Sequence, residues 1–598
     1  MTPSPLAKAL KGVWSGLAVL VLLSALPVLG STITVTNTSD SGPGSLRNAI
    51  DTANSGDTIN FSVTTPATIT LTTPLTIDSS GSKSLTIAGP GASSLAISGG
   101  NSVPVFVIQP LFGLGGPVTV TISGLTIENG SSLFGAGIFN GGTLTLTDSI
   151  VSNNQLGTQF GAGIYNVGTL TLTNTTVSEN VITHSIVGGG AGIDNDHGTL
   201  TLINSSVSRN FAVGDGAYEG GGILNHLGLV NVANSVVSDN VLSSHAGGDA
   251  RGAGIANVDS GSLIVTNSTV SGNSVDSIGS DTGGGGISNG IFPRGHGSVR
   301  LVNSTVSGNS VQGPDGGGGL LNGGLATVIN STISGNSATF GGSGGGIFNK
   351  GFGTIRVTNT TISGNSAGGL LPSGRSSGGI FNVGTATVKN SIVANNSGGN
   401  CAVTLQTTTS EGHNLSDEGT CAGFFIQTGD LNNTPAGLDP AGLKNNGGPT
   451  QTIGLLATSP AVDAITLSPT NDCTDVSGNP VTTDQRSVTR PQGPACDIGA
   501  FEFFQSPFQL EAVQTYLIMA AVEMSPLPPG TQAGLKAPLR GAIDSLNRGN
   551  VKPATNQLSA FVNQVGALMN NGTLTPPQAS ALTTPAEALI QRLINLGG

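Results

Sequence analysis

Charged residues are scarce in this sequence: Asp, Glu, Lys and Arg together make up 9% of its 598 residues. In a globular α/β enzyme about a quarter of the residues are charged. The formal net charge is −12, and Lys and Arg form no run anywhere in the chain. Nucleic acids and anionic membrane surfaces are bound through clustered cations, so neither is an expected partner.

Two further absences narrow the fold class. Glycine is abundant, with 94 residues, but it follows no G-X-Y period, which excludes a collagen triple helix. Val, Ile, Leu and Thr run through the chain in strand-like patches, which excludes a disordered chain. No ten-residue helical pattern occurs between residues 135 and 396, so neither a βαβ fold nor a leucine-rich horseshoe is expected there.

What the sequence does contain is a repeat. Between residues 135 and 396 a unit recurs nine times that reads approximately G-G-I-x-N, a short turn, and x-L-x-L-x-N-S-x-V-S-x-N. The first Asn is present in every unit, at Asn140, Asn166, Asn195, Asn225, Asn257, Asn289, Asn322, Asn349 and Asn382. So is the last, at Asn154, Asn180, Asn210, Asn240, Asn273, Asn309, Asn336, Asn365 and Asn396. A third position is Asp148 once and otherwise Asn, and three residues beyond it every unit has Val or Ile.

Apolar and polar residues alternate within each unit, as in Leu144-Thr145-Leu146, and a period of two predicts short strands with one buried face. One unit cannot bury that face alone, but stacked units can. Equivalent strands would pair in parallel about 4.8 Å apart. Asn at the corners would bond to its copies or adopt the left-handed turn conformation. The sequence therefore predicts an all-β fold, a right-handed parallel β-helix solenoid, with a small C-terminal α-helical domain.

The chain is expected to divide into five segments. Residues 1–30 are predicted to be a signal peptide, because Lys8 and Lys11 precede an apolar stretch; an uncleaved membrane anchor is the alternative. The other segments are an N-terminal cap with irregular rungs (31–130), regular repeats (131–400), a cysteine-containing region (401–506) and a helical module (507–598). Residues 44–50 predict a short capping helix with Ser45 as its N-cap.

All four cysteines lie in the cysteine-containing region. An even number of cysteines close together in an exported protein favours disulfides. The most local of the three possible pairings is Cys401–Cys421 with Cys473–Cys496. A zinc site is the alternative, but no CxxC pair is present.

Three phrases in this region carry a family resemblance: NGGPTQT at 446–452, SPAVD at 459–463, and DQRS at 484–487 leading through RP at 490–491 to CDIGAFE at 496–502. They resemble the choice-of-anchor Q region at the end of secreted bacterial β-helix proteins. The GG-[apolar] and [apolar]-x-x-N elements before them resemble polymorphic outer-membrane-protein-like repeats. The resemblance implies a β-helix protein that is secreted and extracellular, or associated with the cell surface.

The last segment changes to a helical period in Leu510–Met524, Ala533–Leu546, Pro553–Met569 and Ala579–Leu596. Leu535–Asn550 and Asn556–Val562 resemble the FIMAH-type helical domain of secreted bacterial proteins. That resemblance implies an interaction module and no known chemistry.

One candidate metal site follows from a Gly-rich turn. Residues 189–194 (GGAGID) fit a single copy of the calcium nonapeptide, a motif that binds ions between tandem copies. The neighbouring units have no Asp at that position. Asp194 and Asp196, with His197 beside them, are the candidate ligands and Ca²⁺ the candidate ion; a solvated turn is the alternative.

A second candidate site lies in the turns after the last Asn of each unit, which vary in length and carry most of the unusual side chains. Stacking would align these turns along one edge of the solenoid. We therefore predict an acidic, weakly aromatic stripe that binds a carbohydrate or a cation; the alternative is that variable loops tolerate substitution. The residues singled out in the stripe are Asp215, Tyr218, Glu219, Asp249 and Asp281.

Two functions fit these observations. The favoured one is a secreted non-catalytic protein for adhesion or for binding a cell-surface component, matrix or glycan, with no catalytic residues, no obligatory cofactor and no membrane span in the mature chain. The alternative is a polysaccharide lyase or glycoside hydrolase. Such enzymes need converging carboxylates or Arg and Lys bases. Residues 31–400 hold only 10 Lys and Arg residues and show no obvious cluster, which favours the first function.

Overall fold

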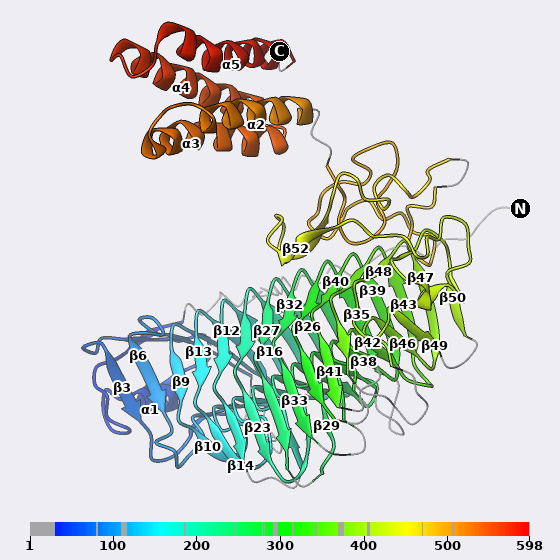
Figure 1. Cartoon of the computed structure of the whole chain (residues 1–598). Coiled ribbons are helices and arrows are strands. Elements are labelled where there is room, and N and C mark those ends of the chain that lie inside the picture. Colours follow the sequence, from blue (N-terminus) through cyan, green and yellow to red (C-terminus); the bar gives the residue numbers. More distant parts are fainter. Residues whose placement is uncertain are drawn as a thin grey trace, which may run out of the picture.

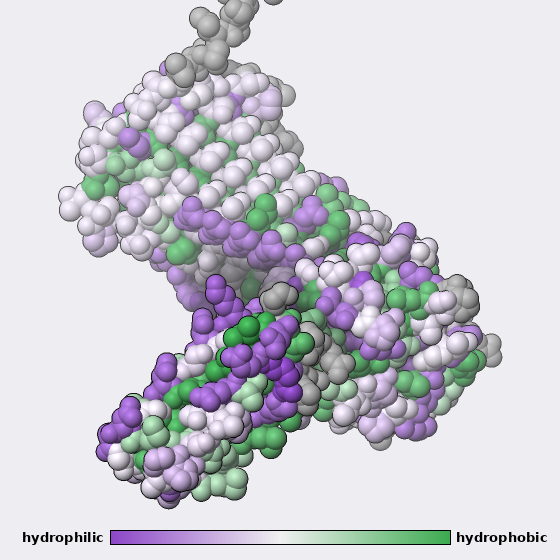
Figure 2. All heavy atoms as spheres, turned by 90° about the horizontal axis from the view of Figure 1, so that it is seen from above, coloured by the Kyte–Doolittle hydropathy of each residue, from purple (hydrophilic) through white to green (hydrophobic). Residues whose placement is uncertain are grey.

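The computed structural model describes residues 30–596, except 79–81, 109–115, 184–186, 246, 278, 280–281, 291–296, 314–315, 341–343, 369–375, 404–406, 469–470 and 505–507. The predicted signal peptide therefore lies outside the described residues, apart from Gly30. The predicted fold class is confirmed: the chain is a parallel β-solenoid followed by a cluster of helices (Figure 1). Figure 2 shows the solenoid mostly in pale colours, in keeping with its scarcity of charged residues.

The solenoid consists of four parallel sheets in the described part of the chain; three run along nearly all of it, and sheet D is confined to residues 131–367. Sheet A has 14 strands from β1 (Thr32–Val35) to β50 (Thr408–Ser410), and sheet B has 13 from β3 (Ala67–Thr70) to β51 (Leu415–Ser416). Sheet C has 12 strands from β4 (Leu75–Ile77) to β49 (Cys401–Val403). Sheet D, also of 12, includes β14 (Gln155–Phe160) and ends at β45 (Ser366–Ala367).

One turn visits the sheets in the order C, A, B, D. A representative turn consists of β15 (Ile164–Asn166), β16 (Thr169–Thr173), β17 (Thr176–Ser178), and the pair β18 (Val181–Thr183) and β19 (Val187–Gly189). Equivalent residues pair in register, so Leu170 lies between its counterparts in the turns before and after. These leucines are fully buried, and the alternation in the sequence is thereby explained by a packed core.

Two of the three Asn corners form continuous rows of hydrogen bonds through the solenoid. Asn240 donates from its backbone N–H and from Nδ2 to Oδ1 of Asn273, at 3.1 and 2.9 Å. Asn273 in turn donates to Asn309 and to the carbonyl of Val237. The corner between sheets C and A repeats the pattern, with Asn195 Nδ2 donating to Asn225 Oδ1 at 2.8 Å. Every amide in these rows is buried except that of Asn396 at the end of one row, which is half-buried, so each turn depends on its neighbours for its hydrogen bonds.

The third corner, between sheets A and B, uses Asn for a different reason. Its residue has a left-handed φ of +46° to +52° in all nine units, a conformation that Asn and Asp adopt more readily than other side chains. Because these side chains lie on the outer side of the corner, several are available to another segment. Asn330 Nδ2 donates to the carbonyl of Thr483, and Asn390 Nδ2 donates to that of Asp472.

A short helix covers the N-terminal end of the stack. Helix α1 (Leu46–Thr52) begins after Ser45, whose Oγ accepts a hydrogen bond from the backbone N–H of Asn48. Leu46, Ala49 and Ile50 are buried and join the solenoid core. The predicted cap and N-cap residue are confirmed, and α1 shields apolar strand ends that would otherwise be exposed.

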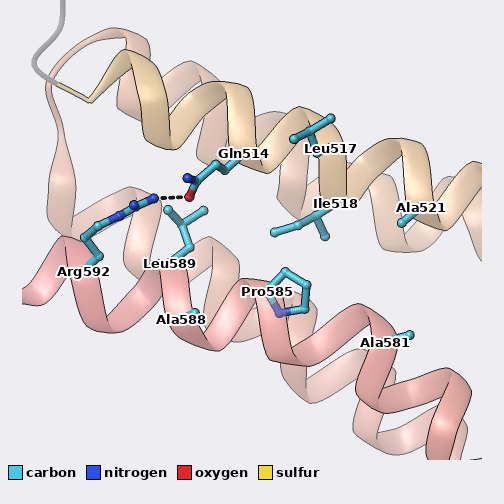
Figure 3. A pocket seen from close by; sticks show the side chains of 9 residues that line it. All are labelled: Gln514, Leu517, Ile518, Ala521, Ala581, Pro585, Ala588, Leu589 and Arg592. Carbon is cyan, nitrogen blue, oxygen red and sulfur yellow. Dashed lines mark hydrogen bonds between the residues drawn. The ribbon is translucent and has the colours of Figure 1, made fainter.

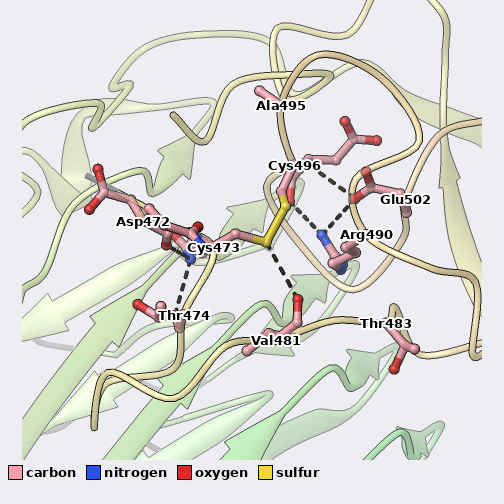
Figure 4. The surroundings of a disulfide bond; sticks show 12 residues. Asp472, Cys473, Thr474, Val481, Thr483, Arg490, Ala495, Cys496 and Glu502 are labelled. Atoms are coloured by element: carbon pink, nitrogen blue, oxygen red, sulfur yellow. Dashed lines mark hydrogen bonds and ion pairs between the residues drawn. A yellow bond between two sulfur atoms is a disulfide. The ribbon is translucent and has the colours of Figure 1, made fainter. Parts of the chain in front are cut away.

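The cysteine-containing region forms the predicted pairs, Cys401–Cys421 and Cys473–Cys496. The second disulfide lies beside the fully buried ion pair of Arg490 and Glu502, whose Nη1 and Oε2 atoms are 2.9 Å apart (Figure 4). Arg490 also donates to the carbonyls of Asp497 and Gly499. These bonds hold a loop-rich segment in one conformation around a small apolar core that includes Ile392 of the solenoid.

One buried glutamine is central to the contact between this region and sheet B of the solenoid. Gln485 Oε1 accepts from Thr332 Oγ1 at 2.6 Å, and Nε2 donates to Thr305 Oγ1 at 2.9 Å. The same amide donates to Thr450 Oγ1 and to the carbonyl of Gln451. The amide oxygen therefore receives its hydrogen bond only when the region is docked on the solenoid, whereas the amide nitrogen has acceptors on both sides.

The C-terminal segment forms the four predicted helices, each within a few residues of the expected bounds. They are α2 (Gln509–Glu523), α3 (Pro529–Asn547), α4 (Val551–Asn570) and α5 (Pro576–Leu596). Leu539, Phe561 and Leu589 lie in their shared core.

We predict that Asn273→Ala lowers the free energy of unfolding by at least about 3 kcal/mol, because it leaves two donors of Asn240 and the carbonyl of Val237 without their partner. Guanidinium unfolding followed by circular dichroism measures the loss. Gln312→Ala is the control: it changes an exposed side chain on a neighbouring strand and should change the free energy of unfolding by no more than about 0.5 kcal/mol. Equal guanidinium midpoints of unfolding for the two variants would contradict the predicted role of Asn273.

We also predict that Gln485→Ala loosens the cysteine-containing region while leaving the solenoid folded. Limited proteolysis should then cleave residues 446–502 faster than in the wild type, because the buried threonine hydroxyls and carbonyls lose their partner. Gln451→Ala is the control, since its exposed side chain is removed but the carbonyl that Gln485 uses remains. Unchanged cleavage of the Gln485 variant would show that the amide is not what docks the region.

Candidate functional site

A groove of about 420 Å³ lies between sheets C and D, across the turns that contain residues 134–259. One part of its wall is apolar and aromatic. The rings of Phe134 and Tyr165 are 5.2 Å apart, and those of Phe139 and Tyr165 are 5.5 Å apart. Phe134 is 36% exposed, so an aromatic edge is presented to the solvent. The other apolar side chains that line the groove are those of Phe160, Ala217, Leu224 and Val258.

The other part of the wall is strongly polar, and its residues come from three successive turns. In sheet C the register pairs Tyr165 with Asp194, and it pairs Asp196 of β20 (Ile193–Asp196) with His226 of β25 (Ile223–His226). Asp259 lies in the turn after β30 (Ile255–Val258). Glu219 enters from sheet D at the end of β24 (Ala217–Glu219). Parallel stacking thus gathers residues that are some thirty positions apart in the sequence.

Asp196 is the centre of this polar wall. It accepts a hydrogen bond from Tyr165 Oη at 2.8 Å, and its Oδ1 lies 2.6 Å from His197 Nδ1 and 3.0 Å from His226 Nδ1. Burial alone would raise its pKa, but the hydrogen bonds from Tyr165 and His197 outweigh burial and hold the pKa below its ordinary value. Burial, together with Asp196, raises the pKa of Tyr165.

His226 connects Asp196 to the next turn. Its Nε2 lies 2.9 Å from Asp259 Oδ2, so each ring nitrogen faces a carboxylate. The rings of His197 and His226 meet edge to face, with centroids 5.4 Å apart. This chain of carboxylate, imidazole and carboxylate fixes the orientation of the ring.

Asp194 is the most buried acid in the groove. Its side chain belongs to a residue that is 2% exposed, and Oδ1 has no hydrogen-bond partner among the described residues. Burial, with the charges of Asp196 and Glu219, raises its pKa well above the ordinary value. The groove therefore holds one carboxyl that favours its proton beside another that favours its charge.

Glu219 is paired with a cation from the following turn. Arg251 Nη1 lies 3.1 Å from Glu219 Oε1, and Nη2 lies 3.2 Å from Asp249 Oδ2. Burial raises the pKa of Glu219, and Arg251 opposes that rise without cancelling it.

The residues singled out from the sequence are divided by the structure. Asp194, Asp196 and Glu219 line the groove, Asp249 pairs with Arg251, and Asp215 is exposed at the bend between β23 (Phe211–Gly214) and β24. Asp281 lies outside the described residues.

The prediction that Tyr218 belongs to an exposed binding stripe is wrong. Its turn was expected to be a surface loop, but residues 211–219 mostly form strands of sheet D. Alternation along β24 turns Tyr218 inward, where it is fully buried against residues such as Leu242 and Ala250. It therefore contributes to packing and not to an exposed surface.

Sequence reasoning missed His226, Asp259 and the aromatic wall. The available signal was the position just after the first Asn of each unit, which carries Asp196, His226 and, one residue later, Asp259 in consecutive turns.

A second cavity, of about 520 Å³, lies between helices α2 and α5 (Figure 3). Its lining is apolar, with residues such as Leu517, Ile518 and Leu589, except for Gln514 and Arg592, which bond to each other. It offers a packing surface and no reactive group. Figure 2 shows other exposed apolar residues between hydrophilic ones on this helical cluster, where Met524 is 82% exposed.

Comparison of the chain with protein-family models, with curated proteins and with solved structures finds no match. The resemblances to the choice-of-anchor Q region and to the FIMAH-type domain therefore stay predictions. Within the described part of the chain, no helix is long and apolar enough to cross a membrane.

We predict that Arg251→Gln destabilises the fold in a pH-dependent way. Without the guanidinium the folded-state pKa of Glu219 rises further above its unfolded value. The loss of stability is then small near pH 4, below the unfolded pKa, where Glu219 is mostly protonated in both states, and it grows as the pH rises through the two pKa values. Thermal or urea unfolding should show a loss of about 1–3 kcal/mol at pH 7 and a smaller one at pH 4.

Arg251→Lys keeps the positive charge and should remove most of that pH dependence. A loss of stability by Arg251→Gln that is equal at pH 4 and pH 7 would mean that packing, and not the ion pair, explains the effect.

Proposed function

We propose that the protein binds an extracellular polysaccharide in the groove between sheets C and D. The observation that carries the proposal is the pairing, in one groove, of an aromatic wall with a row of hydrogen-bonding acidic and histidine side chains. Sugars present apolar C–H faces and hydroxyl edges, so they are recognised by surfaces of this mixed kind.

The shape of the groove fits a polymer better than a small molecule. Its walls come from successive turns, and stacking places Asp196, His226 and Asp259 one after another along the solenoid. Repeat proteins build extended binding surfaces in this way, with each turn adding one contact.

Secretion is part of the same proposal. The basic and apolar pattern of residues 1–30 supports export. Two disulfides support an oxidising compartment, since disulfides are rare in reducing cytosol. Adhesion to a cell surface or matrix through a glycan follows from such a location.

Glycoside hydrolysis is the second candidate, because the structure supplies a feature that the sequence did not reveal. Asp194, Asp196 and Glu219 line one groove, and two carboxyl groups are the minimum equipment for cleaving a glycosidic bond. Binding and hydrolysis differ in whether a bound polymer is shortened.

We expect the purified chain to bind at least one member of a panel of neutral, acidic and amino polysaccharides, measured by affinity electrophoresis with product release scored by reducing ends. Phe134→Ala should weaken that binding about tenfold, as loss of an aromatic contact of about 1–1.5 kcal/mol would. Phe352→Ala, which removes another exposed phenylalanine (68%) far along the solenoid, is the matched control.

Binding that responds equally to the two substitutions would place the polysaccharide elsewhere. Release of reducing ends that disappears in Glu219→Gln would favour the hydrolase. No binding to any member of the panel would overturn the proposal.

A further inference from the structure

We propose that Asp196, His197 and His226 form a binding site for a divalent transition-metal ion such as Zn²⁺, with Asp259 as the residue that positions His226. The three side chains offer one carboxylate oxygen and two imidazole nitrogens. The site concerns this cluster alone and does not depend on polysaccharide binding.

The ligand atoms are already gathered. One carboxylate oxygen of Asp196 and one ring nitrogen of each histidine all lie within 4.8 Å of one another. Asp196 Oδ1 lies 2.6 Å from His197 Nδ1 and 3.0 Å from His226 Nδ1. Ligands about 2.1 Å from a tetrahedral ion lie about 3.4 Å apart. Shifts of less than about 1 Å in partly exposed side chains would therefore bring these two pairs to metal-binding separations.

The second ring nitrogen of His226 supplies independent support. A histidine that binds a metal through one nitrogen usually donates its other N–H to a carboxylate, which fixes the tautomer and orients the ring. Asp259 Oδ2 lies 2.9 Å from His226 Nε2, on the opposite side of the ring from the nitrogen that faces Asp196. Asp259 therefore occupies the place of the orienting carboxylate.

The charges around the cluster also call for a cation. Asp194 lies two residues before Asp196, is almost fully buried in the same groove, and has an Oδ1 atom with no hydrogen-bond partner in the described part of the chain. Glu219 lines the groove as well. A divalent ion at Asp196 would lower the electrostatic cost of keeping these carboxyl groups together.

The donor set selects the kind of ion. Two imidazoles with one carboxylate suit Zn²⁺, Co²⁺ or Ni²⁺, whereas Ca²⁺ takes six to eight oxygen ligands. The sequence had indicated Asp194 and Asp196, with His197 beside them, as candidate Ca²⁺ ligands; the structure adds His226, which sheet C pairs with Asp196 from the next turn, so that two imidazoles face one carboxylate. Three protein ligands would leave a tetrahedral ion one position for water or for an oxygen of a bound molecule.

The test uses the full chain, freed of metal by a chelator and titrated with Co²⁺ and then with Zn²⁺ alone. We expect one Co²⁺ per chain, with the visible absorption bands of a tetrahedral nitrogen and oxygen site, displaced by one equivalent of Zn²⁺. His226→Ala and His197→Ala should each weaken binding more than 100-fold, and Asp259→Asn should weaken it about 10- to 100-fold.

Two matched controls are available on the same solenoid. His245→Ala removes an exposed histidine, and Asp276→Asn removes an exposed carboxylate on β33 (Ser274–Ser277), so both should leave binding unchanged. Circular dichroism and the melting temperature in chelator should be the same for all variants as for the wild type. Zn²⁺ should then raise the melting temperature of the wild type and the controls, but not of the His226 variant.

Absence of stoichiometric Co²⁺ or Zn²⁺ binding by the wild type would overturn the site, as would binding by the His197 or the His226 variant that is as tight as that of the wild type. Preference for Ca²⁺ over both transition metals would overturn it too. A chain that binds polysaccharide but no Zn²⁺ would overturn the metal site alone, and the reverse result would overturn only the proposed function.

Discussion

The solenoid depends on one constraint: at two of the three Asn corners, the buried amide of one turn is satisfied by the equivalent Asn of the next turn. Asn210, Asn240 and Asn273 illustrate it, since each donates two hydrogen bonds to the side-chain oxygen of its successor. A buried amide without its partner costs free energy, so neighbouring turns must stay in register. That register carries the leucine and valine columns of the core with it, and the sheets follow from both.

The same constraint determines which positions of each turn are fixed by packing and which are free to take part in binding. Positions that repeat in every turn are occupied by residues that stacking requires, and they leave little room for chemistry. Side chains suited to binding or catalysis are found at positions where the residue type differs from turn to turn. One example is the outward column of sheet C, in which Tyr165 is followed by Asp194 and then by Leu224. The groove is therefore confined to a few turns of a long solenoid.

The acidic groove is distinctive because charged residues are scarce in the rest of the chain. Where 9% of residues are charged, the meeting of Asp194, Asp196, Glu219 and Asp259 within one groove is a local concentration of acid. Arg251 and two histidines face it. The arrangement supports both proposals, since hydroxyl groups of a sugar and a divalent ion each bind well to oriented carboxylate and imidazole groups.

The sequence by itself determined the elements whose cause is local or periodic. The repeat predicted the stacked strands, Ser45 predicted the cap of α1, helical spacing predicted α2 to α5, and proximity along the chain predicted both disulfides. Tertiary structure alone decided the path of the irregular turns, because their lengths do not repeat and their contacts lie in neighbouring turns. It turned Tyr218 into the core and brought His226 and Asp259 to Asp196. Asp196, His226 and Asp259 belong to three successive turns, with about thirty positions between one and the next, and only parallel stacking places them side by side.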